Sequence, residues 1–228
     1  MFLLPPLAQA PESSLAHMMD AVSQHLTKRV QCFAADWQWR INSNVAIKFL
    51  YDCIEQNKPV TIFGTAFSFV HLLDLLKTTR LKHALPDGSA AMKTGGYKGR
   101  SREVPKTELH RSINNKLGIP EKRIISEYGM CELSSQAYDG ALNHTHAVPH
   151  LFRFPPWARA RVVSPETMQE VKLGETGLLQ ITDLANVGSV LSLLTEDLAC
   201  RYDNGFELLG RAELAKSRGC SLMNFTYA

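Results

Sequence analysis

The stretch Pro59-Val-Thr-Ile-Phe-Gly-Thr65 decides the fold of this 228-residue chain. It is a short run of apolar and β-branched residues that opens with proline and closes at glycine, which is typical of a buried strand. The residues from Phe67 to Thr79 follow at once, and their apolar side chains recur at helical spacing. The stretch therefore predicts a strand, a tight turn and a helix in direct succession.

The same order of strand, turn and helix recurs downstream. Ala90–Met92 leads into the turn Thr94-Gly95-Gly96, and Arg123–Ser126 leads into Tyr128-Gly129. Between them, Pro105 is placed to open a helix that Gly118 and Pro120 end. Upstream, two further helices are expected, one after Ser13-Ser14 and one over Asn44–Asn57. Strands that alternate with helices predict a parallel sheet with helical crossovers, and therefore an α/β fold. Ligands of open parallel sheets bind beyond the carboxyl ends of the strands, where these glycine turns are expected.

The pattern changes near residue 140, after which short strands and turns replace the long helices. We therefore expect two subdomains: an α/β subdomain over residues 1–140 that binds nucleotide and acyl group, and a smaller, β-rich, barrel-like subdomain over residues 141–228. The strands expected in the second are antiparallel, with a turn at Asp203-Asn204-Gly205. These strands are Ala160–Val163, Gly177–Thr182, Ser189–Leu194 and Phe206–Leu209.

Composition excludes several classes of protein. With 45% hydrophobic and 21% charged residues, the chain has the composition of a soluble globular protein. Its net charge is only +3, without a basic cluster, so no nucleic-acid partner is expected. No window approaches the roughly 18 apolar residues of a membrane span. Met1–Ala10 has no basic region of a signal peptide, and five cysteines without CxxC spacing predict reduced thiols, so we expect a cytoplasmic protein.

Two strings of residues are candidates for chemistry. In Ser126–Gln136, Tyr128 is placed to stack on a base and Glu132 to hold a divalent cation that bridges phosphates. In Leu194–Arg211, Asp197 at a strand end is placed to accept hydrogen bonds from both ribose hydroxyls, and Arg211 to reach the same sugar or a phosphate. The alternatives are that the first segment is an ordinary polar loop at the end of a strand, and that the second is an ordinary β-hairpin.

In this order, and followed by Arg218-Gly219, the two strings resemble the adenylate-forming ligase superfamily. Its members show a Tyr-Gly-x-Thr-Glu segment, then Thr-Gly-Asp, Gly-Arg and a Lys-x-Arg-Gly hinge. Within the superfamily the chain is most similar to the bacterial acyl-protein synthetases, the long-chain-fatty-acid ligases of luminescence operons. The corresponding segments here are Tyr128-Gly-Met-Cys-Glu132, Thr195-Glu-Asp197, Gly210-Arg211 and Lys216-Ser-Arg-Gly219.

The resemblance implies part of the N-terminal domain of an adenylate-forming ligase, and a reaction in two steps. A fatty acid or other carboxylic acid reacts with ATP to give an acyl-adenylate, and the acyl group then passes to a cysteine, with an acyl-transferase or reductase as partner protein. The implied roles are an adenine pocket at Thr94, Gly95, Gly96, Tyr128 and Gly129, Mg²⁺ binding and catalysis at Glu132, ribose binding at Asp197 and Arg211, and acyl acceptance at Cys220.

Departures from the family pattern leave two alternatives open. The phosphate loop that precedes these motifs in the superfamily is not found in these residues, so we expect the N-terminal portion of the family's chain to be missing. Glu196 stands where the superfamily has glycine, and its charge is expected to weaken ATP binding by roughly 1 kcal/mol. The alternatives are a non-catalytic remnant that binds a nucleotide, an acyl group or a partner, and a phenylacetate-type acyl-CoA ligase fragment in which Cys220 is incidental.

Overall fold

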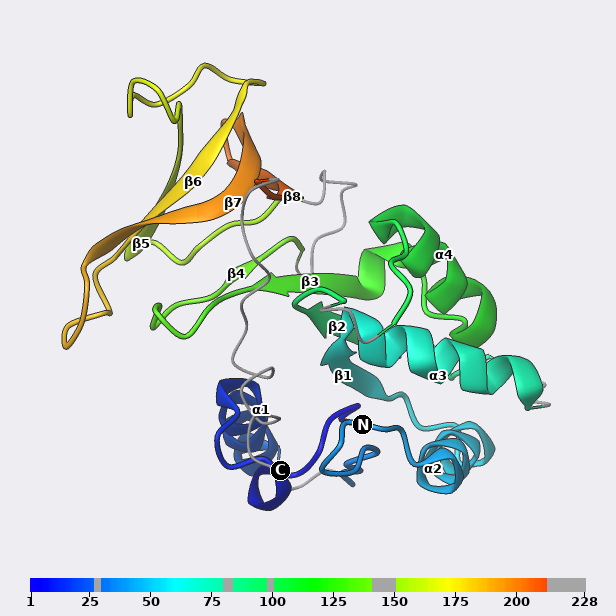
Figure 1. Ribbon diagram of the computed structural model, residues 1–228. Helices are drawn as coiled ribbons and strands as arrows, with labels where there is room; N and C mark the ends of the chain where they lie inside the picture. Colours follow the sequence, from blue (N-terminus) through cyan, green and yellow to red (C-terminus); the bar gives the residue numbers. More distant parts are fainter. Residues whose placement is uncertain (27–29, 80–83, 98–100, 141–150, 213–228) are drawn as a thin grey trace. The chain divides into compact units, whose positions relative to one another are not determined.

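The computed structural model describes residues 1–26, 30–79, 84–97, 101–140 and 151–212 (Figure 1). The chain divides into two compact units, one holding Met1–Ile124 and the other beginning at Ile125. The boundary expected from the sequence, at residues 140 and 141, falls inside the second unit. Each unit has its own hydrophobic core and is described separately below.

The first unit has the helices and strands that the apolar spacing predicts, displaced by one to three residues at their ends. Three of its helices begin at a hydroxyl or amide side chain that accepts a backbone N–H of the first turn: Ser13 for α1, Asn42 for α2 and Thr65 for α3. The elements are α1 Ser14–His25, α2 Ser43–Glu55, β1 Thr61–Thr65, α3 Ala66–Thr78, β2 Ala90–Thr94 and α4 Lys106–Leu117, with 3₁₀ turns at Leu7–Gln9 and Glu121–Arg123.

Strands β1 and β2 pair in parallel, as predicted, with Thr61 opposite Ala90 and Thr65 opposite Thr94. The two strands therefore end side by side, which places the turns that follow them at one sheet edge. Gly64 has a packing role, because a Cβ there would lie 2.9 Å from the Cβ of Leu3. Its glycine is thus explained by the close approach of the N-terminal segment.

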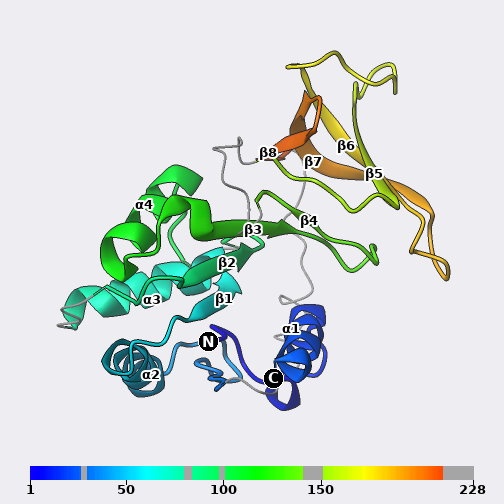
Figure 2. The same ribbon diagram turned by 180° about the vertical axis from the view of Figure 1, so that it is seen from behind.

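Helix α3 supplies much of the first core, with eight buried residues among its thirteen. Figures 1 and 2 show α3 and α4 lying next to each other, and the two helices are in contact. Helix α4 follows Pro105 and ends at Gly118, whose φ of 72° is left-handed, as the sequence predicts for a glycine at a helix C-terminus. The helical crossovers therefore form where the proline and glycine signals put them.

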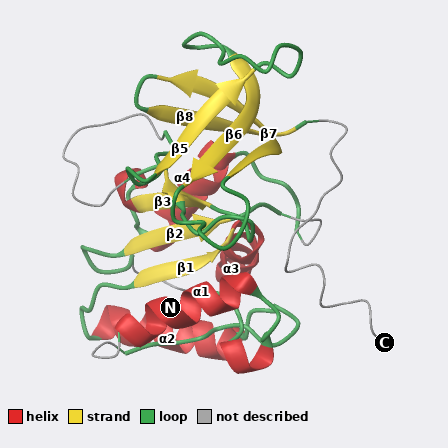
Figure 3. Cartoon of the chain, turned by 90° about the vertical axis from the view of Figure 1, so that its left-hand side faces the viewer, coloured by secondary structure: helices red, strands yellow, loops and turns green. Residues whose placement is uncertain are grey.

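The second unit is built from antiparallel strands. Strand β3 (Ile124–Tyr128) pairs with β4 (Ala137–Tyr138). A second sheet has the order β5-β6-β7-β8 with every neighbour antiparallel, drawn in yellow in Figure 3. Its strands are β5 Ala158–Val163, β6 Thr176–Asp183, β7 Ser192–Tyr202 and β8 Gly205–Arg211.

One expected strand differs from the structure. The strand predicted at Ser189–Leu194 begins instead at Ser192 and continues to Tyr202 as β7. Asp197 therefore lies inside a strand, and its prediction at a strand end is wrong. The extension is stabilised by pairing on both sides, with β6 and with β8, which local apolar patterning does not reveal.

The core of the second unit gathers eight buried side chains from seven segments. The core residues are Tyr128, Ala137, Phe152, Val162, Leu179, Ile181, Ala199 and Phe206.

In the described part of the chain, none of the helices is both long and apolar enough to cross a membrane.

Candidate functional site

Asp197 is the centre of the candidate site in the second unit. The Tyr128 hydroxyl donates a hydrogen bond of 2.7 Å to Oδ2 of Asp197, and Arg211 Nε lies 3.5 Å from Oδ1. The Asp197 side chain is 14% exposed and that of Arg211 is 38% exposed. The structure thus brings together three of the predicted site residues, which lie 69 and 14 positions apart in the sequence.

An irregularity in the β7–β8 pairing places Arg211 opposite Asp197. The register shifts between Leu198 and Ala199, and from there Gly210 pairs with Leu198 and Arg211 with Asp197. Without this extra residue in β8, Asp197 would lie opposite Gly210. Gly210 has a φ of 135°, which residues with a Cβ rarely adopt. The Gly210-Arg211 segment therefore has a structural explanation, because the glycine permits the bulge that places Arg211 opposite Asp197.

Thr195 fixes the backbone of Asp197. Its hydroxyl accepts a hydrogen bond from the Asp197 N–H at 3.1 Å and donates one to the Leu179 carbonyl on β6 at 2.8 Å. Thr195 is buried, whereas the neighbouring Glu196 is exposed. The threonine of the Thr195-Glu-Asp197 segment thus positions the carboxylate, and the alternation along β7 turns Glu196 to the opposite face.

Tyr128 lies among phenylalanines. Its ring makes edge contacts with Phe152, Phe154 and Phe206 at centroid distances of 6.0, 6.3 and 5.8 Å, and only 7% of the residue is exposed. Burial, and next the negative charge of Asp197, raise the pKa of the Tyr128 hydroxyl far above its ordinary value. The hydroxyl therefore remains a donor at neutral pH. Stacking of Tyr128 on a base stays a prediction, and little of its ring is exposed for it.

The Asp197 carboxylate retains capacity for a ligand. An ionised carboxylate offers about four lone-pair positions. Tyr128 uses one on Oδ2, and Arg211 faces one on Oδ1. Two neighbouring hydroxyl groups, as in a ribose, match the remaining positions in number. The arrangement can therefore hold a diol while Arg211 balances the charge.

The segment after Tyr128 carries Gly129 and Glu132. A Cβ on Gly129 would lie 2.4 Å from Oε1 of Glu127 and 3.2 Å from Cγ of Gln136, so a larger residue there would displace these two side chains. Glu132 is exposed, and its backbone carbonyl accepts a hydrogen bond from the Asn186 side chain at 2.8 Å. Among the described residues no three His, Cys, Asp or Glu side chains gather as a metal site. Mg²⁺ binding at Glu132 stays a prediction.

The turn Thr94-Gly95-Gly96 lies in the first unit, directly after β2. Gly95 has a left-handed φ of 59°, while Cβ atoms at Gly95 and Gly96 would meet no other atom within 4 Å. The conformation accounts for the first glycine, and open space surrounds both. Their assignment to an adenine pocket with Tyr128 stays a prediction.

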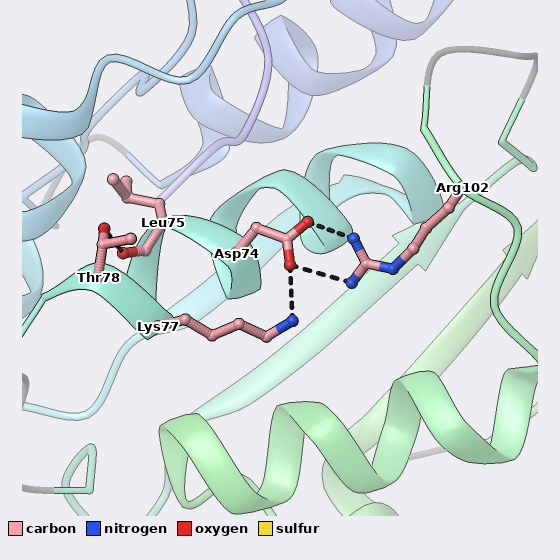
Figure 4. Close-up of polar contacts among 5 residues, drawn as sticks. All are labelled: Asp74, Leu75, Lys77, Thr78 and Arg102. Atoms are coloured by element: carbon pink, nitrogen blue, oxygen red, sulfur yellow. Dashed lines mark hydrogen bonds and ion pairs between the residues drawn. The ribbon is translucent and has the colours of Figure 1, made fainter.

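The chain that follows this turn is tied back to α3. The Arg102 guanidinium donates to both carboxylate oxygens of Asp74, one bond being 3.0 Å, and Lys77 donates to Asp74 at 2.9 Å (Figure 4). The Arg102 hydrogen bond is the main reason that the pKa of Asp74 falls to about 2. This ion pair fixes Arg102 to α3. The Tyr97 hydroxyl also donates a hydrogen bond of 2.6 Å to the Val104 carbonyl.

Cys220, the predicted acyl acceptor, lies outside the described residues. Cys32, Cys53 and Cys200 carry free thiols, whereas Cys131 is disulfide-bonded, so the expectation of reduced thiols is wrong for Cys131. Burial raises the pKa of both the Cys32 and Cys53 thiols, which disfavours the nucleophilic thiolate at neutral pH. These two cysteines are therefore poor candidates for acyl acceptance.

Sequence reasoning missed two residues that shape the site. Asp183 and Asn186 contact the segment that carries Glu132, although they follow it by about 50 positions. Asp183 ends β6 and Asn186 lies three residues later, in a stretch that is typical of an ordinary turn. The available signal in the sequence is the carboxylate that ends the alternating pattern of β6.

Comparison with known proteins gives one family and several structural neighbours. Residues 38–226 match the family described as acyl-protein synthetase, LuxE. The long-chain-fatty-acid–luciferin-component ligase of Aliivibrio fischeri is 22% identical over 195 residues, which are 80% of this chain and 50% of that protein. The chain thus spans about half the length of this curated relative.

The structural neighbours share the fold at low identity. ATP-bound MatB from Rhodopseudomonas palustris superposes with a TM-score of 0.52 at 19% identity, over 72% of this chain and 33% of MatB. McyG A-PCP complexed with phenylalanyl-adenylate gives a TM-score of 0.50 at 15% identity, over 75% of this chain and 33% of that chain. The fold is therefore that of adenylate-forming ligase domains, as the resemblance implied.

Proposed function

Because the chain belongs to the LuxE acyl-protein synthetase family, we propose that it takes part in ATP-dependent activation of a fatty acid and accepts the acyl group on Cys220. Its substrates are a fatty acid and ATP, with Mg²⁺ as cofactor, and its partner is an acyl-transferase or reductase that receives the acyl group. The curated relative is named for a long-chain fatty acid and a luciferin component, which supports this substrate class.

The observation that carries the proposal is the placement of Tyr128 and Arg211 on the two oxygens of Asp197. A carboxylate held at a fixed angle, mostly buried and charge-balanced by one arginine, suits the two hydroxyls of a ribose. Structural neighbours hold ATP in one case and an adenylate in another, which supports a nucleotide ligand for this fold.

The proposed reaction has two steps, formation of the acyl-adenylate and transfer of the acyl group. A carboxylate oxygen of the fatty acid attacks the α-phosphorus of ATP, and the bond to the bridging oxygen breaks, so pyrophosphate leaves with the electron pair. The Cys220 thiolate then attacks the acyl carbon, the bond from that carbon to the phosphate oxygen breaks, and AMP leaves. The thiol proton passes to solvent before the attack.

The residues of the chain have separate tasks in this scheme. Asp197 and Arg211 hold the ribose and thereby orient the α-phosphate, while Thr94, Gly95 and Gly96 line the base. Glu132 would hold Mg²⁺, whose bound charge offsets that of the phosphates, and a single carboxylate with phosphate oxygens is an ordinary ligand set for this ion. Lys216 and Arg218 favour the Cys220 thiolate by their positive charge.

Acyl transfer can be tested apart from activation. The purified chain is incubated with a synthetic tetradecanoyl-adenylate carrying a radioactive acyl group, and hydroxylamine-sensitive label on the protein is counted. We expect label in the wild type and in the matched control Cys53→Ser, and loss of label in Cys220→Ser. Label that persists in Cys220→Ser, or that disappears in Cys131→Ser alone, contradicts the assignment of the acceptor.

Activation is measured in parallel as exchange between ATP and pyrophosphate that depends on fatty acid and Mg²⁺. We expect exchange in the wild type and a loss of at least tenfold in Asp197→Asn. Formation of acyl-coenzyme A without protein label would favour the phenylacetate-type ligase. Nucleotide binding without exchange or labelling would favour the binding module.

A further inference from the structure

Asp183, the last residue of β6, is a fully buried carboxylate whose described partners are all uncharged donors. Its Oδ2 accepts the Ser134 backbone N–H at 3.0 Å. Its Oδ1 accepts the Ser135 hydroxyl at 2.9 Å and the Ala185 N–H at 3.0 Å. Burying a carboxylate is costly unless it is well hydrogen-bonded, and three donors meet that requirement here.

Asn186 holds the same segment from a second direction. Its side-chain amide donates to the Glu132 carbonyl at 2.8 Å and to the Val190 carbonyl at 2.8 Å, and its amide oxygen accepts the Ser134 hydroxyl at 3.1 Å. The amide therefore joins the segment before Gln136 to the turn between β6 and β7. Every hydrogen-bonding group of the Asn186 side chain is used in this way.

Asp183 and Asn186 together fix three closely spaced positions, namely residues 132, 134 and 135. A further contact adds to them, since the Trp157 indole N–H donates to the Ser135 hydroxyl at 3.0 Å. The Glu132 side chain, by contrast, is exposed. The result is a carboxylate that projects from a backbone held rigidly beneath it, which is how protein sites orient a ligand-bearing side chain.

We propose that Asp183 and Asn186 are positioning residues that hold the Glu132 carboxylate in place for a divalent cation bound with the nucleotide phosphates. This inference rests on the proposed function, because it gives Asp183 a role only if Glu132 binds Mg²⁺ with ATP. An apolar residue at the end of β6 would avoid the desolvation cost. The carboxylate adds three directed hydrogen bonds to the segment that carries Glu132.

Two nearly isosteric variants separate positioning from packing. Asp183→Asn puts an amide in place of one carboxylate oxygen, so that one of the N–H or O–H donors loses its acceptor. Asn186→Asp turns the amide nitrogen into an oxygen that repels the Glu132 carbonyl. Thr182→Val is the matched control, because its hydroxyl on the same strand bonds only to Ser192 among the described hydrogen bonds.

The first measurement needs no ligand. Hydrogen exchange of peptides covering residues 130–136, followed by mass spectrometry, should be at least tenfold faster in both variants than in the wild type and in Thr182→Val. Equal exchange in all four proteins would overturn the positioning role. If Asp183→Asn lowers the melting temperature so far that the chain unfolds, Asn186→Asp carries the test.

The second measurement compares ATP affinity with Mg²⁺ and with EDTA by calorimetry, and AMP affinity as a reference. We expect the Mg²⁺-dependent gain in ATP affinity to be about tenfold smaller in both variants and in Glu132→Gln than in the wild type. A reduction of this size is ordinary for residues that orient a metal ligand, and AMP affinity should be unchanged. A gain that survives in both variants overturns this inference alone. A wild type without nucleotide binding contradicts the proposed function, and the inference with it.

Discussion

At Asp197 one carboxylate serves two neighbours and keeps acceptor positions for a ligand. Tyr128 donates to one oxygen and Arg211 faces the other, while Thr195 holds the backbone. Each contact comes from a different strand or sheet edge, so the carboxylate cannot turn without breaking one of them. The fixed orientation is what a binding site for two adjacent hydroxyls requires.

Removal of the Tyr128 hydroxyl tests this arrangement at a single atom. We expect Tyr128→Phe to lower the free energy of unfolding by about 1.5–3 kcal/mol, since a hydrogen bond to a charged group is lost while the ring contacts remain. Urea denaturation measures the change. The control Tyr138→Phe removes the hydroxyl of a more exposed ring and should stay within about 0.5 kcal/mol of the wild type. Equal losses in the two variants would contradict the assignment.

Asp74 gives a prediction in pH. Its folded-state pKa lies at about 2, below the ordinary value of 3.8, so its ion pair with Arg102 stabilises the fold above pH 3.8. This contribution is lost as the pH falls through about 2. Because the Asp74 side chain is 40% exposed, solvent screening limits the effect to about 1 kcal/mol. Urea denaturation should find Asp74→Asn less stable than the wild type at pH 7, with the difference narrowing between pH 4 and pH 2.

A constant difference over this range would show that the ion pair does not stabilise the fold. The substitution Asp87→Asn, at an exposed residue of the turn before β2, is the control, and it should change stability by less than about 0.5 kcal/mol at every pH.

Among the elements, the hairpin of β7 and β8 sets the geometry of the site. One extra residue in β8 shifts the register and brings Arg211 opposite Asp197. We expect Gly210→Ala to cost roughly 1–3 kcal/mol of stability, because alanine is strained at a φ of 135°. Relief of the strain by removal of the bulge would move Arg211 away from Asp197, so nucleotide affinity should fall as well.

Thermal unfolding and calorimetric titration with AMP measure both effects. The matched control is Gly174→Ala, a glycine with a φ of 81° and no neighbour within 4 Å of its Cβ, at a turn away from Arg211. It should lose stability and keep its AMP affinity. Loss of AMP affinity in both variants, or in neither, would contradict the claim that the bulge at Gly210 places Arg211 for nucleotide binding.

The elements differ in how far the sequence predicts them. Helices α1 and α4 follow from apolar spacing with Ser13, Pro105 and Gly118 at their ends, since these signals are local. The length of β7 and the role of Gly64 do not, because both depend on partners far away in the chain. The same holds for Asp183, whose partners Ser134 and Ser135 lie 49 and 48 positions earlier. Motif residues were found, but their hydrogen-bond partners were not.

For the whole molecule, the two units have separate hydrophobic cores. Truncation of a fully buried side chain should therefore act mainly in its own unit. We expect Phe206→Ala to cost about 3–5 kcal/mol and Leu72→Ala about 2–5 kcal/mol of local stability. Hydrogen exchange should quicken in β6 to β8 for the first variant and in α3 and α4 for the second. Uniform loss of protection in either variant would show one cooperative core.

The central claim is that Asp197 holds the ribose of an adenine nucleotide. The most direct measurement is a calorimetric cycle that combines wild type and Asp197→Asn with ATP and 2′,3′-dideoxy-ATP. If the carboxylate binds the two hydroxyls, each single change weakens binding by roughly 10- to 100-fold, and the double change is no weaker than either one. Losses that add in full, or equal affinity of the wild type for both nucleotides, would contradict the claim.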